Sequence, residues 1–126
     1  MIKVPYYSNL ATLRKILEEG LPNFPELRCQ DATRVVSKTL GLEERAGYYK
    51  PLGLWHAWNY DPKLDLYVDL TLDQFSDDYE PITILHKSGY LLLEDKERTN
   101  SQLKMPIDIY DIKCIKKYKS LKAAKS

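Results

Sequence analysis

The residues best suited to chemistry are a histidine, His56, and an aspartate, Asp69, on two segments joined by a turn. Leu54–Tyr60 and Leu64–Leu70 have the composition of short β-strands, and Asp61-Pro62-Lys63 between them has turn chemistry. In the simplest hairpin, which pairs Asp61 with Leu64, the histidine lies directly opposite the aspartate, with Cβ atoms ~4.5–5.5 Å apart. A type I turn with proline has the wrong twist for a tight hairpin, so a bulge or a longer loop would shift this register.

A histidine oriented by a carboxylate can activate a nucleophile, and Cys29 is the candidate in this chain. Apolar residues at helical spacing predict a helix from about Cys29 or Gln30 to Leu40, with Gly41 as its stop. Unpaired N–H groups and the positive dipole end at a helix N-terminus stabilise a thiolate. A thiolate attacks a carbonyl, an imidazole takes and returns the proton, and a carboxylate fixes the tautomer. Cys29, His56 and Asp69 therefore predict a catalytic triad.

Each of these residues also has a purely structural explanation. Free cysteine is often a buried small hydrophobe, and His56, between two tryptophans, would be an ordinary core histidine if it were satisfied there. Asp69 could cap or bridge a loop, although a carboxylate within an apolar run needs a partner. Trp58 shares a face with His56, which makes it a candidate for substrate binding, but core packing is the commoner role of such a residue.

The order of elements, helices first and strands afterwards, predicts an α+β fold in which N-terminal helices pack on an antiparallel β-sheet. A first helix, capped by Ser8 and ended by Gly20, is joined to the second by the proline-bounded link Leu21–Leu27. The other expected elements are strands at Pro81–Leu85, Tyr90–Leu93 and about 107–112, loops at Glu43–Gly53 and Lys96–Lys104, and a weak, frayed helix at Ile115–Ala124.

Length and composition predict one domain, residues 1–126, with an ordinary globular balance of 44% hydrophobic and 29% charged residues. The net charge of +1 argues against a protein that is basic throughout. Six lysines and no acid follow Asp111, so residues 115–126 are expected to form a basic tail. This tail lacks the interleaved aromatics and glycines of nucleic-acid-binding modules, which argues against nucleic acid as a partner.

The two cysteines do not make a disulfide framework, and together with two histidines they lack the paired spacing of metal ligands. No apolar run is long enough for a membrane span, and the N-terminus lacks the apolar segment of a signal peptide. We therefore expect a protein without metal or cofactor, cytoplasmic or exported by a dedicated secretion system.

Three stretches together resemble a known superfamily. Cys29 opening a helix, Trp55-His56-Ala57-Trp58, and Tyr67-Val68-Asp69-Leu70-Thr71-Leu72-Asp73-Gln74-Phe75 look like the papain-like and transglutaminase-like cysteine superfamily. The pattern is most similar to small bacterial Cys-His-Asp members and to the papain-fold glutamine deamidase domains of bacterial toxins. The resemblance covers Asn23–Phe75, and in that superfamily the histidine and aspartate lie on adjacent strands.

The resemblance implies a fold, an oxyanion hole and an activity. The oxyanion hole commonly uses the backbone N–H of the cysteine and a side-chain amide nearby, for which Asn23 and Gln30 are the candidates; the usual papain-type residue is glutamine, so Asn23 departs from the pattern. The short loop 43–53 also departs and implies a shallow or open cleft.

The implied activity is that of a cysteine-dependent amide hydrolase or acyltransferase that acts on a protein or peptide through a thioester. Deamidation of glutamine, proteolysis and transglutamination all remain open. Two alternatives from other classes are a non-catalytic binding domain on the same fold and an adaptor that uses the basic C-terminal tail.

Overall fold

The computed structural model describes residues 2–125, and within them the chain forms four α-helices and one curled five-stranded antiparallel sheet. The α+β prediction is therefore confirmed. The elements are α1 (Tyr7–Gly20), α2 (Cys29–Leu40), β1 (Glu43–Tyr49), β2 (Leu54–Asp61), β3 (Leu66–Asp69), the short 3₁₀ helix η1 (Leu72–Gln74), β4 (Thr83–His86), β5 (Leu92–Glu94), α3 (Lys96–Lys104) and α4 (Ile109–Lys125).

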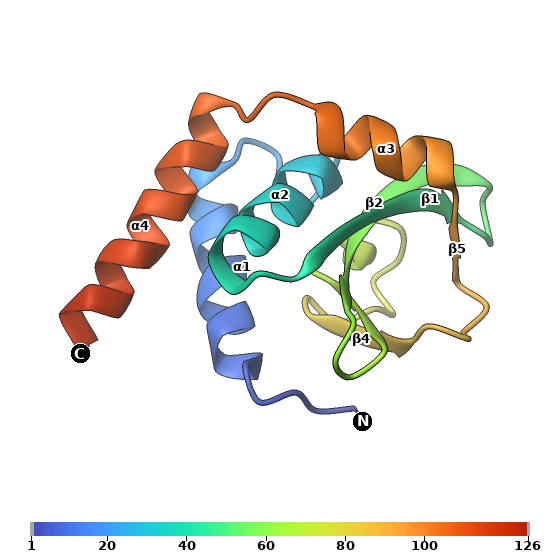
Figure 1. The fold of residues 1–126 in the computed structure, drawn as a ribbon, viewed down its shortest axis with the longest axis horizontal. Helices are drawn as coiled ribbons and strands as arrows, with labels where there is room; N and C mark the ends of the chain where they lie inside the picture. The colour runs from blue at the N-terminus through green and yellow to red at the C-terminus, as the bar shows by residue number, and fades with distance from the viewer. Residues whose placement is uncertain (1, 126) are drawn as a thin grey trace.

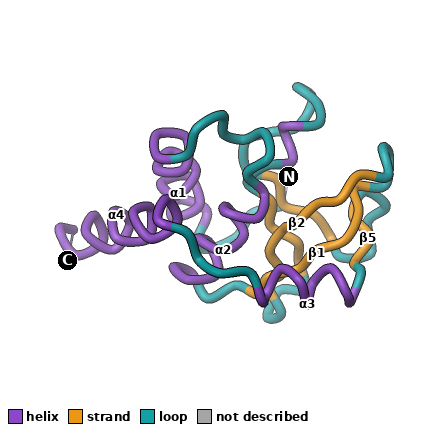
Figure 2. Tube along the Cα trace, turned by 90° about the horizontal axis from the view of Figure 1, so that it is seen from above, coloured by secondary structure: helices purple, strands orange, loops and turns teal. Residues whose placement is uncertain are grey.

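The strand order is β4-β3-β2-β1-β5, so the first four strands form a meander and β5 returns to the far edge beside β1. Helices α1, α2 and α4 gather on one side of the sheet, and α3 runs along β1 (Figure 1). Seen from above, the strands and the three gathered helices occupy opposite halves of the molecule (Figure 2). The largest core cluster lies between these halves, where Leu10, Leu13 and Leu17 of α1 and Val35 of α2 meet Val68 of β3.

Helix α2 begins and ends where its sequence predicts. It starts at Cys29 and stops at Gly41, whose φ of 75° is the left-handed conformation that glycine adopts readily. Its apolar stripe is buried. Arg34 on the same helix bonds to both carboxylate oxygens of Glu44 in β1, at 3.1 and 3.0 Å, so a buried ion pair fastens the helix to the sheet.

The β2–β3 hairpin exists, but the predicted register is wrong by two residues. Asp61 pairs with Leu66 rather than with Leu64. The intervening loop is longer than predicted because Asp61 Oδ1 accepts hydrogen bonds from the backbone N–H groups of Lys63 and Leu64, and Asp65 takes a left-handed φ of 55°. A shift of two keeps every side chain on its predicted face, because the side-chain period of a strand is two.

The first helix, α1, lies close to its predicted position, but the predicted capping roles of Ser8 and Gly20 are wrong. The residue preceding α1 is Tyr6, which makes no side-chain capping bond, and Ser8 lies inside the helix. Gly20 is the last helical residue, and the next residue, Leu21, has an extended φ of −114°. A Cβ at Gly20 would lie 2.9 Å from Cys114 Sγ, so this glycine permits the close approach of α4.

Segment 43–53 was predicted to be a loop, but its first part is the strand β1. Its charges misled the prediction because each is paired: Glu44 with Arg34, and Arg45 with both Glu43 and Glu94. Pairing with β2 on one side and β5 on the other fixes β1, whatever its own strand propensity.

The predictions for Lys96–Lys104 and for residues 107–112 are also wrong, because both segments are helical. Asp95 caps α3 by accepting from the backbone N–H of Glu97, and Asp108 Oδ1 accepts from the N–H of Asp111 in the first turn of α4. Alternating isoleucines at 107–112 therefore mark a helix start and not a strand.

The basic tail is part of α4, as the weak helical pattern of Ile115–Ala124 predicted. Cys114 and Tyr118 of this helix belong to the core cluster that α1 and α2 share. Lys116, Lys117, Lys119 and Lys122 are exposed around this buried stripe, so the tail is helical and packs on the core as far as Tyr118.

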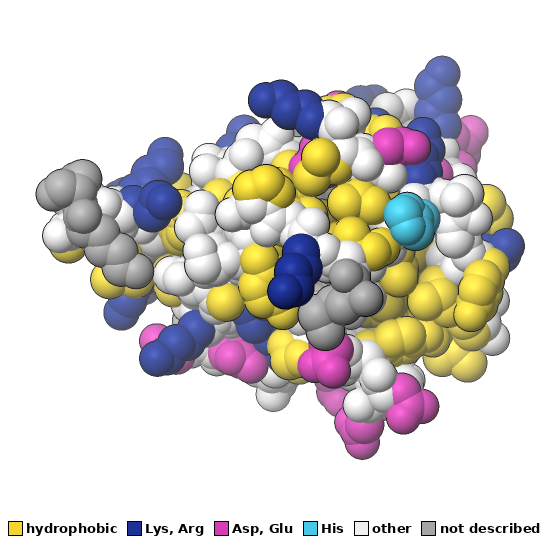
Figure 3. Space-filling view, turned by 90° about the horizontal axis from the view of Figure 1, so that it is seen from below, with side chains coloured by type: hydrophobic (Ala, Val, Ile, Leu, Met, Phe, Trp, Pro, Cys, Tyr) yellow, Lys and Arg dark blue, Asp and Glu magenta, His cyan; other side chains and the backbone are white. Residues whose placement is uncertain are grey.

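The predicted strands near 81–85 and 90–93 are present as β4 and β5, which lie on opposite edges of the sheet. No helix formed by residues 2–125 has the length and hydropathy that a membrane crossing requires. On the face drawn in Figure 3, acidic and basic side chains are interspersed around hydrophobic ones.

Gly47 in β1 provides a test of how closely α3 and β5 cover this strand. A Cβ at Gly47 would overlap the backbone oxygen of Leu93, whereas a Cβ at Gly41 would meet nothing within 4 Å. We expect Gly47→Ala to lower the free energy of unfolding by about 3 kcal/mol, because backbone must move, and Gly41→Ala by about 1 kcal/mol, from its left-handed φ alone. Urea unfolding of both variants measures the two losses of stability, and equal losses would contradict the close approach of β5 to Gly47.

Candidate active site

The centre of the site is a buried pair between His56 of β2 and Asp69 at the end of β3. His56 Nε2 and Asp69 Oδ2 are 2.6 Å apart, and both side chains are almost completely excluded from solvent. The register shift makes them diagonal neighbours instead of directly opposite residues. They still meet, because diagonal residues on one face lie within reach of a long side chain.

The pair lies where β3 ends. Strand β3 pairs with β2 only at residues 59–61, so the first part of β2 has a hydrogen-bonded neighbour only on its β1 side. Gly47 is the β1 residue directly opposite His56. Side chains from the helix side and from the far side of the sheet can therefore meet beside the unpaired edge of β2.

Cys29 approaches this edge from the helix side. It is the first residue of α2 and packs against Ala46 of β1 and Ala57 of β2, with Trp55 alongside. Its thiol interacts with the imidazole of His56, where it acts on the pKa of the ring through hydrogen bonding and charge. His56 Nδ1, the ring nitrogen that Asp69 does not use, makes no completed hydrogen bond within the described chain. The thiol therefore acts on the pKa of the imidazole, while Nδ1 has no completed hydrogen bond.

The pKa of His56 reflects these neighbours. Burial lowers it, and the charge and hydrogen bond of Asp69, followed by the Cys29 thiol, outweigh burial and raise the pKa from 6.5 to about 10. At neutral pH the ring is therefore protonated, with one N–H donating to Asp69 and the other available to the cysteine.

Asp69 is itself held in place by Thr71, a residue that the sequence analysis did not single out. Asp69 Oδ1 accepts from the backbone N–H of Thr71 at 2.9 Å and from its hydroxyl at 3.3 Å. Oδ2 is then left for His56. A threonine two residues after a carboxylate is the signal for such a turn, and the carboxylate it holds has little freedom to rotate.

Gln74 joins the aspartate turn to the segment before Cys29. Its amide nitrogen donates to the carbonyl of Thr71 at 3.0 Å, and its amide oxygen accepts from the backbone N–H of Leu27 at 3.4 Å. Gln74 lies in η1, together with Asp73. Gln74 therefore connects the turn that carries Asp69 to the backbone just before Cys29.

Arg14 of α1 fixes the other side of the same turn. Its guanidinium makes two parallel bonds to the carboxylate of Asp73, at 2.8 and 2.9 Å, and donates to the carbonyl of Leu70. A bidentate arginine–carboxylate pair is geometrically specific. The turn that carries Asp69 is therefore tied to α1 as well as to the sheet.

Phe75 completes the surroundings of the imidazole. Its ring meets the His56 ring edge-on with centroids 5.0 Å apart and stacks on Tyr49 at 4.2 Å. Together with Trp58, 5.9 Å from the His56 ring, these aromatics exclude water from the far side of the imidazole. This arrangement explains why the ring is fully buried.

Three of the predicted site residues lie differently from expectation. Trp58 is only 1% exposed and packs against Tyr67, so it belongs to the core and has no surface for a substrate. The structure gives Asn23, exposed and with a φ of 63°, no side-chain bond to Cys29 or His56. Gln30 is half-buried, and its carbonyl accepts from Gln102 of α3 at 3.3 Å.

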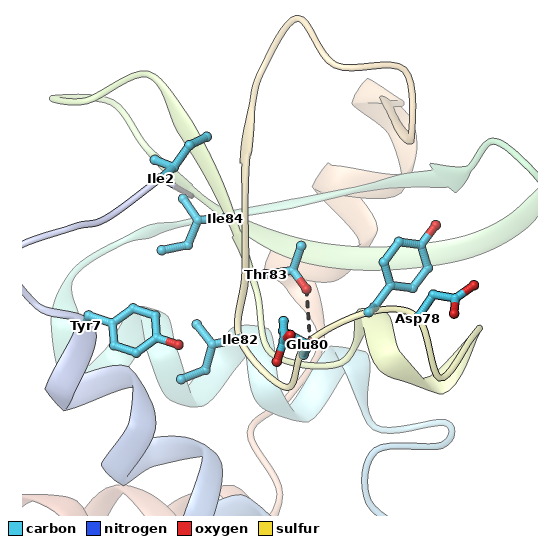
Figure 4. A pocket seen from close by; sticks show the side chains of 8 residues that line it. Ile2, Tyr7, Asp78, Glu80, Ile82, Thr83 and Ile84 are labelled. Atoms are coloured by element: carbon cyan, nitrogen blue, oxygen red, sulfur yellow. Dashed lines mark hydrogen bonds between the residues drawn. The ribbon is translucent and has the colours of Figure 1, made fainter.

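The thiol has little contact with solvent, since Cys29 is 6% exposed. Half-buried Trp55 packs on the cluster that contains it, and Leu27, two residues earlier, is 92% exposed with a φ of 60°. A cavity of about 330 Å³ lies between the start of the chain and β4, where Ile2, Tyr7 and Ile84 line it (Figure 4). Cys29 does not line that cavity.

The His56 pKa predicts how stability depends on pH. A group whose pKa is higher in the folded state stabilises it fully below its unfolded value, here 6.5, and this contribution is lost as pH rises through about 10. His56→Gln should therefore lose about 3–5 kcal/mol at pH 6, and the difference from wild type should shrink steadily up to pH 10. Urea unfolding at several pH values measures it, with exposed His86→Gln as the matched control. A difference that stays constant with pH would contradict the buried imidazolium.

Comparison with protein-family models, with curated proteins and with solved structures finds no match for this chain.

Proposed function

We propose that this protein is a cysteine-dependent amide hydrolase or acyltransferase in which Cys29, His56 and Asp69 form the catalytic triad. One observation carries the proposal: the imidazole of His56 lies between the Asp69 carboxylate, 2.6 Å from Nε2, and the Cys29 thiol. A buried histidine needs one partner to be satisfied. A second neighbour that is nucleophilic, at a helix N-terminus, is what thiol catalysis requires.

In the proposed reaction the thiolate of Cys29 attacks a carboxamide carbon, and the electron pair of the C=O bond moves to oxygen. When the tetrahedral intermediate collapses, the C–N bond breaks and the amine or ammonia leaves with a proton from His56 Nδ1. The remaining thioester is then attacked by water or by an acceptor amine, whose proton returns to His56. The raised pKa of His56 favours the first half, because an imidazolium is already present to protonate the leaving group.

The oxyanion would be stabilised by the first N–H groups of α2. Arg28, which precedes the helix, provides no side-chain cap, so the backbone N–H groups beside Cys29 remain available to a ligand. In this proposal these backbone N–H groups take the role that was expected of the Asn23 side chain. Gln30 contributes its backbone N–H in the proposal rather than its side-chain amide.

Within this class we favour a carboxamide of a protein or peptide as substrate, with glutamine deamidation as the first activity to test. The surfaces nearest Cys29 are apolar, since Leu27 is exposed and Trp55 is partly so. An apolar side chain next to the reacting amide would fit against them. The preference for deamidation rests on the resemblance to papain-fold toxin domains, and proteolysis and transglutamination are the competing outcomes.

The low exposure of Cys29 supports one alternative, a non-catalytic binding domain of the same architecture. In that case His56 and Asp69 would be a structural ion pair, and the thiol would be a core side chain. Reactivity of the thiol separates the two functions without knowledge of the substrate.

We expect iodoacetamide at pH 6 to alkylate Cys29 at least ~10-fold faster than Cys114, because the proposed triad sets a histidine and a helix N-terminus beside its sulfur, and both activate a thiol. Cys114 is the internal control, since it is buried and desolvation raises its pKa. His56→Ala and Asp69→Asn should each slow the alkylation of Cys29 by ~10-fold or more, while His86→Ala leaves it unchanged. Mass spectrometry of cysteine-containing peptides measures each rate, and equal rates at the two cysteines would support the binding domain.

The activity itself is tested with a library of short peptides that contain glutamine and asparagine. Amide-to-acid conversion adds ~1 Da, cleavage produces shorter peptides, and added methylamine is incorporated if the thioester transfers to amines. We expect one of these changes with wild type and its loss in Cys29→Ala. If the peptides do not distinguish wild type from Cys29→Ala, and His56→Ala leaves the alkylation rate of Cys29 unchanged, the enzyme proposal fails.

A further inference from the structure

A second cluster of polar side chains lies where the start of α2 meets the start of α4. Asp31 in the first turn of α2, Asp108 just before α4 and Asp111 in the first turn of α4 each present one carboxylate oxygen, and these oxygens all lie within 4.8 Å of one another. The three residues line a cavity of about 30 Å³. The cavity is large enough for one ion or one or two waters.

Two buried acceptors at this cavity have no partner among the residues that the structure describes. Asp111 is 4% exposed and its Oδ1 makes no hydrogen bond. Gln102 of α3 is 1% exposed and lines the same cavity, and its Oε1 is also unbonded, although its amide nitrogen donates to Gln30 and Glu44. An unsatisfied buried acceptor costs about 1–3 kcal/mol. Two of them beside three carboxylates indicate a missing positive or hydrogen-donating group.

Among the described residues, the cations of the protein pair with only one of the three carboxylates, that of Asp31. Arg28 lies 3.3 Å from Asp31, and Arg34, which lines the cavity, gives its guanidinium to Glu44 and to the carbonyls of Gln102 and Met105. Between residues 2 and 124 no lysine or arginine forms an ion pair with Asp108 or Asp111. Asp111 is the buried member of the cluster, whereas Asp31 is half-buried and Asp108 is exposed. Burial and the Asp31 carboxylate raise the pKa of Asp111 to about 8, so its ionised form needs a counter-ion.

We propose that Asp31, Asp108 and Asp111, with the amide oxygen of Gln102, bind one hard divalent cation, Ca²⁺ or Mg²⁺. All four candidate ligands are oxygens, and carboxylate and amide oxygens are the ligands that these two cations prefer. Bound water would complete the coordination. No metal was expected from the sequence, because its cysteines and histidines lack the spacing of metal ligands. The three carboxylates gave no local signal, since they come from segments about 80 residues apart in the chain.

The bound cation would join the N-termini of α2 and α4 and hold the segment that connects α3 to α4. It would act as a structural crosslink, and its binding does not depend on any chemistry at Cys29. For this reason the Cys29→Ala variant should bind the cation as well as wild type does.

Thermal unfolding of the full chain, freed of metal by a chelator and dialysed, tests the proposal. At a cation concentration 100-fold above Kd, we expect CaCl₂ or MgCl₂ to raise Tm by roughly 5–10 °C relative to NaCl of equal ionic strength. Isothermal titration with the same salts should give a stoichiometry of one. A Tm that neither salt raises at 5 mM would overturn the proposal.

The decisive variant is Asp111→Asn, which keeps the size of the side chain and removes its charge. Without added cation it should be at least as stable as wild type, because it relieves the crowding of carboxylates, so a folding failure does not obscure the result. It should lose the cation-dependent rise in Tm. Asp77→Asn, which removes one exposed carboxylate elsewhere, is the matched control and should keep the rise, as should Cys29→Ala. A rise that Asp111→Asn retains in full would show that the salts act elsewhere.

Discussion

The contact between His56 and Asp69 is the constraint on which the rest of the candidate site depends. Both groups are buried, and a buried ion pair is tolerated only when each partner is held in a good geometry and its remaining hydrogen-bonding capacity is used. Asp69 meets this condition through Thr71, and His56 meets it through one ring nitrogen. The second ring nitrogen is the exception among the described residues, and the Cys29 thiol is a neighbour of the ring that could accept a proton from it.

The segment from Asp69 to Phe75 has a physical reason for nearly every polar residue. Asp69 orients the imidazole, Thr71 fixes Asp69, and Asp73 fastens the turn to α1 through Arg14. Gln74 reaches the backbone just before Cys29, and Phe75 covers the imidazole. The same few residues thus build the aspartate half of the site and tie it to the cysteine half. A motif in which nearly every polar residue makes a specific contact can be recognised from the sequence, even when the β2–β3 strand register cannot.

Local signals decided which parts of the fold could be predicted. Helix α2 was placed correctly because an apolar stripe, an acidic first turn and a left-handed glycine all agree. The site residues were paired correctly on one face because a register error of two does not change which face a side chain occupies. In contrast, β1 was missed because its charges are neutralised by Arg34 and Glu94, which are distant in the sequence. Helix α3 is polar and weakly amphipathic, so its single buried residue, Gln102, gave no periodic signal.

The missed elements are also those that close the site. Helix α3 lies against β1, where the hydroxyl of Thr99 accepts from the backbone N–H of Ala46 and donates to its carbonyl. Ala46 in turn packs on Cys29. A segment predicted to be an open loop is therefore a strand that is covered on its outer side, and the thiol beneath it is nearly buried. For the proposed reaction, enclosure of this kind would have two opposing consequences. It would strengthen the electrostatic interaction between the cysteine and the histidine by excluding water, and it would require the covering residues to move before a carbonyl could reach the sulfur.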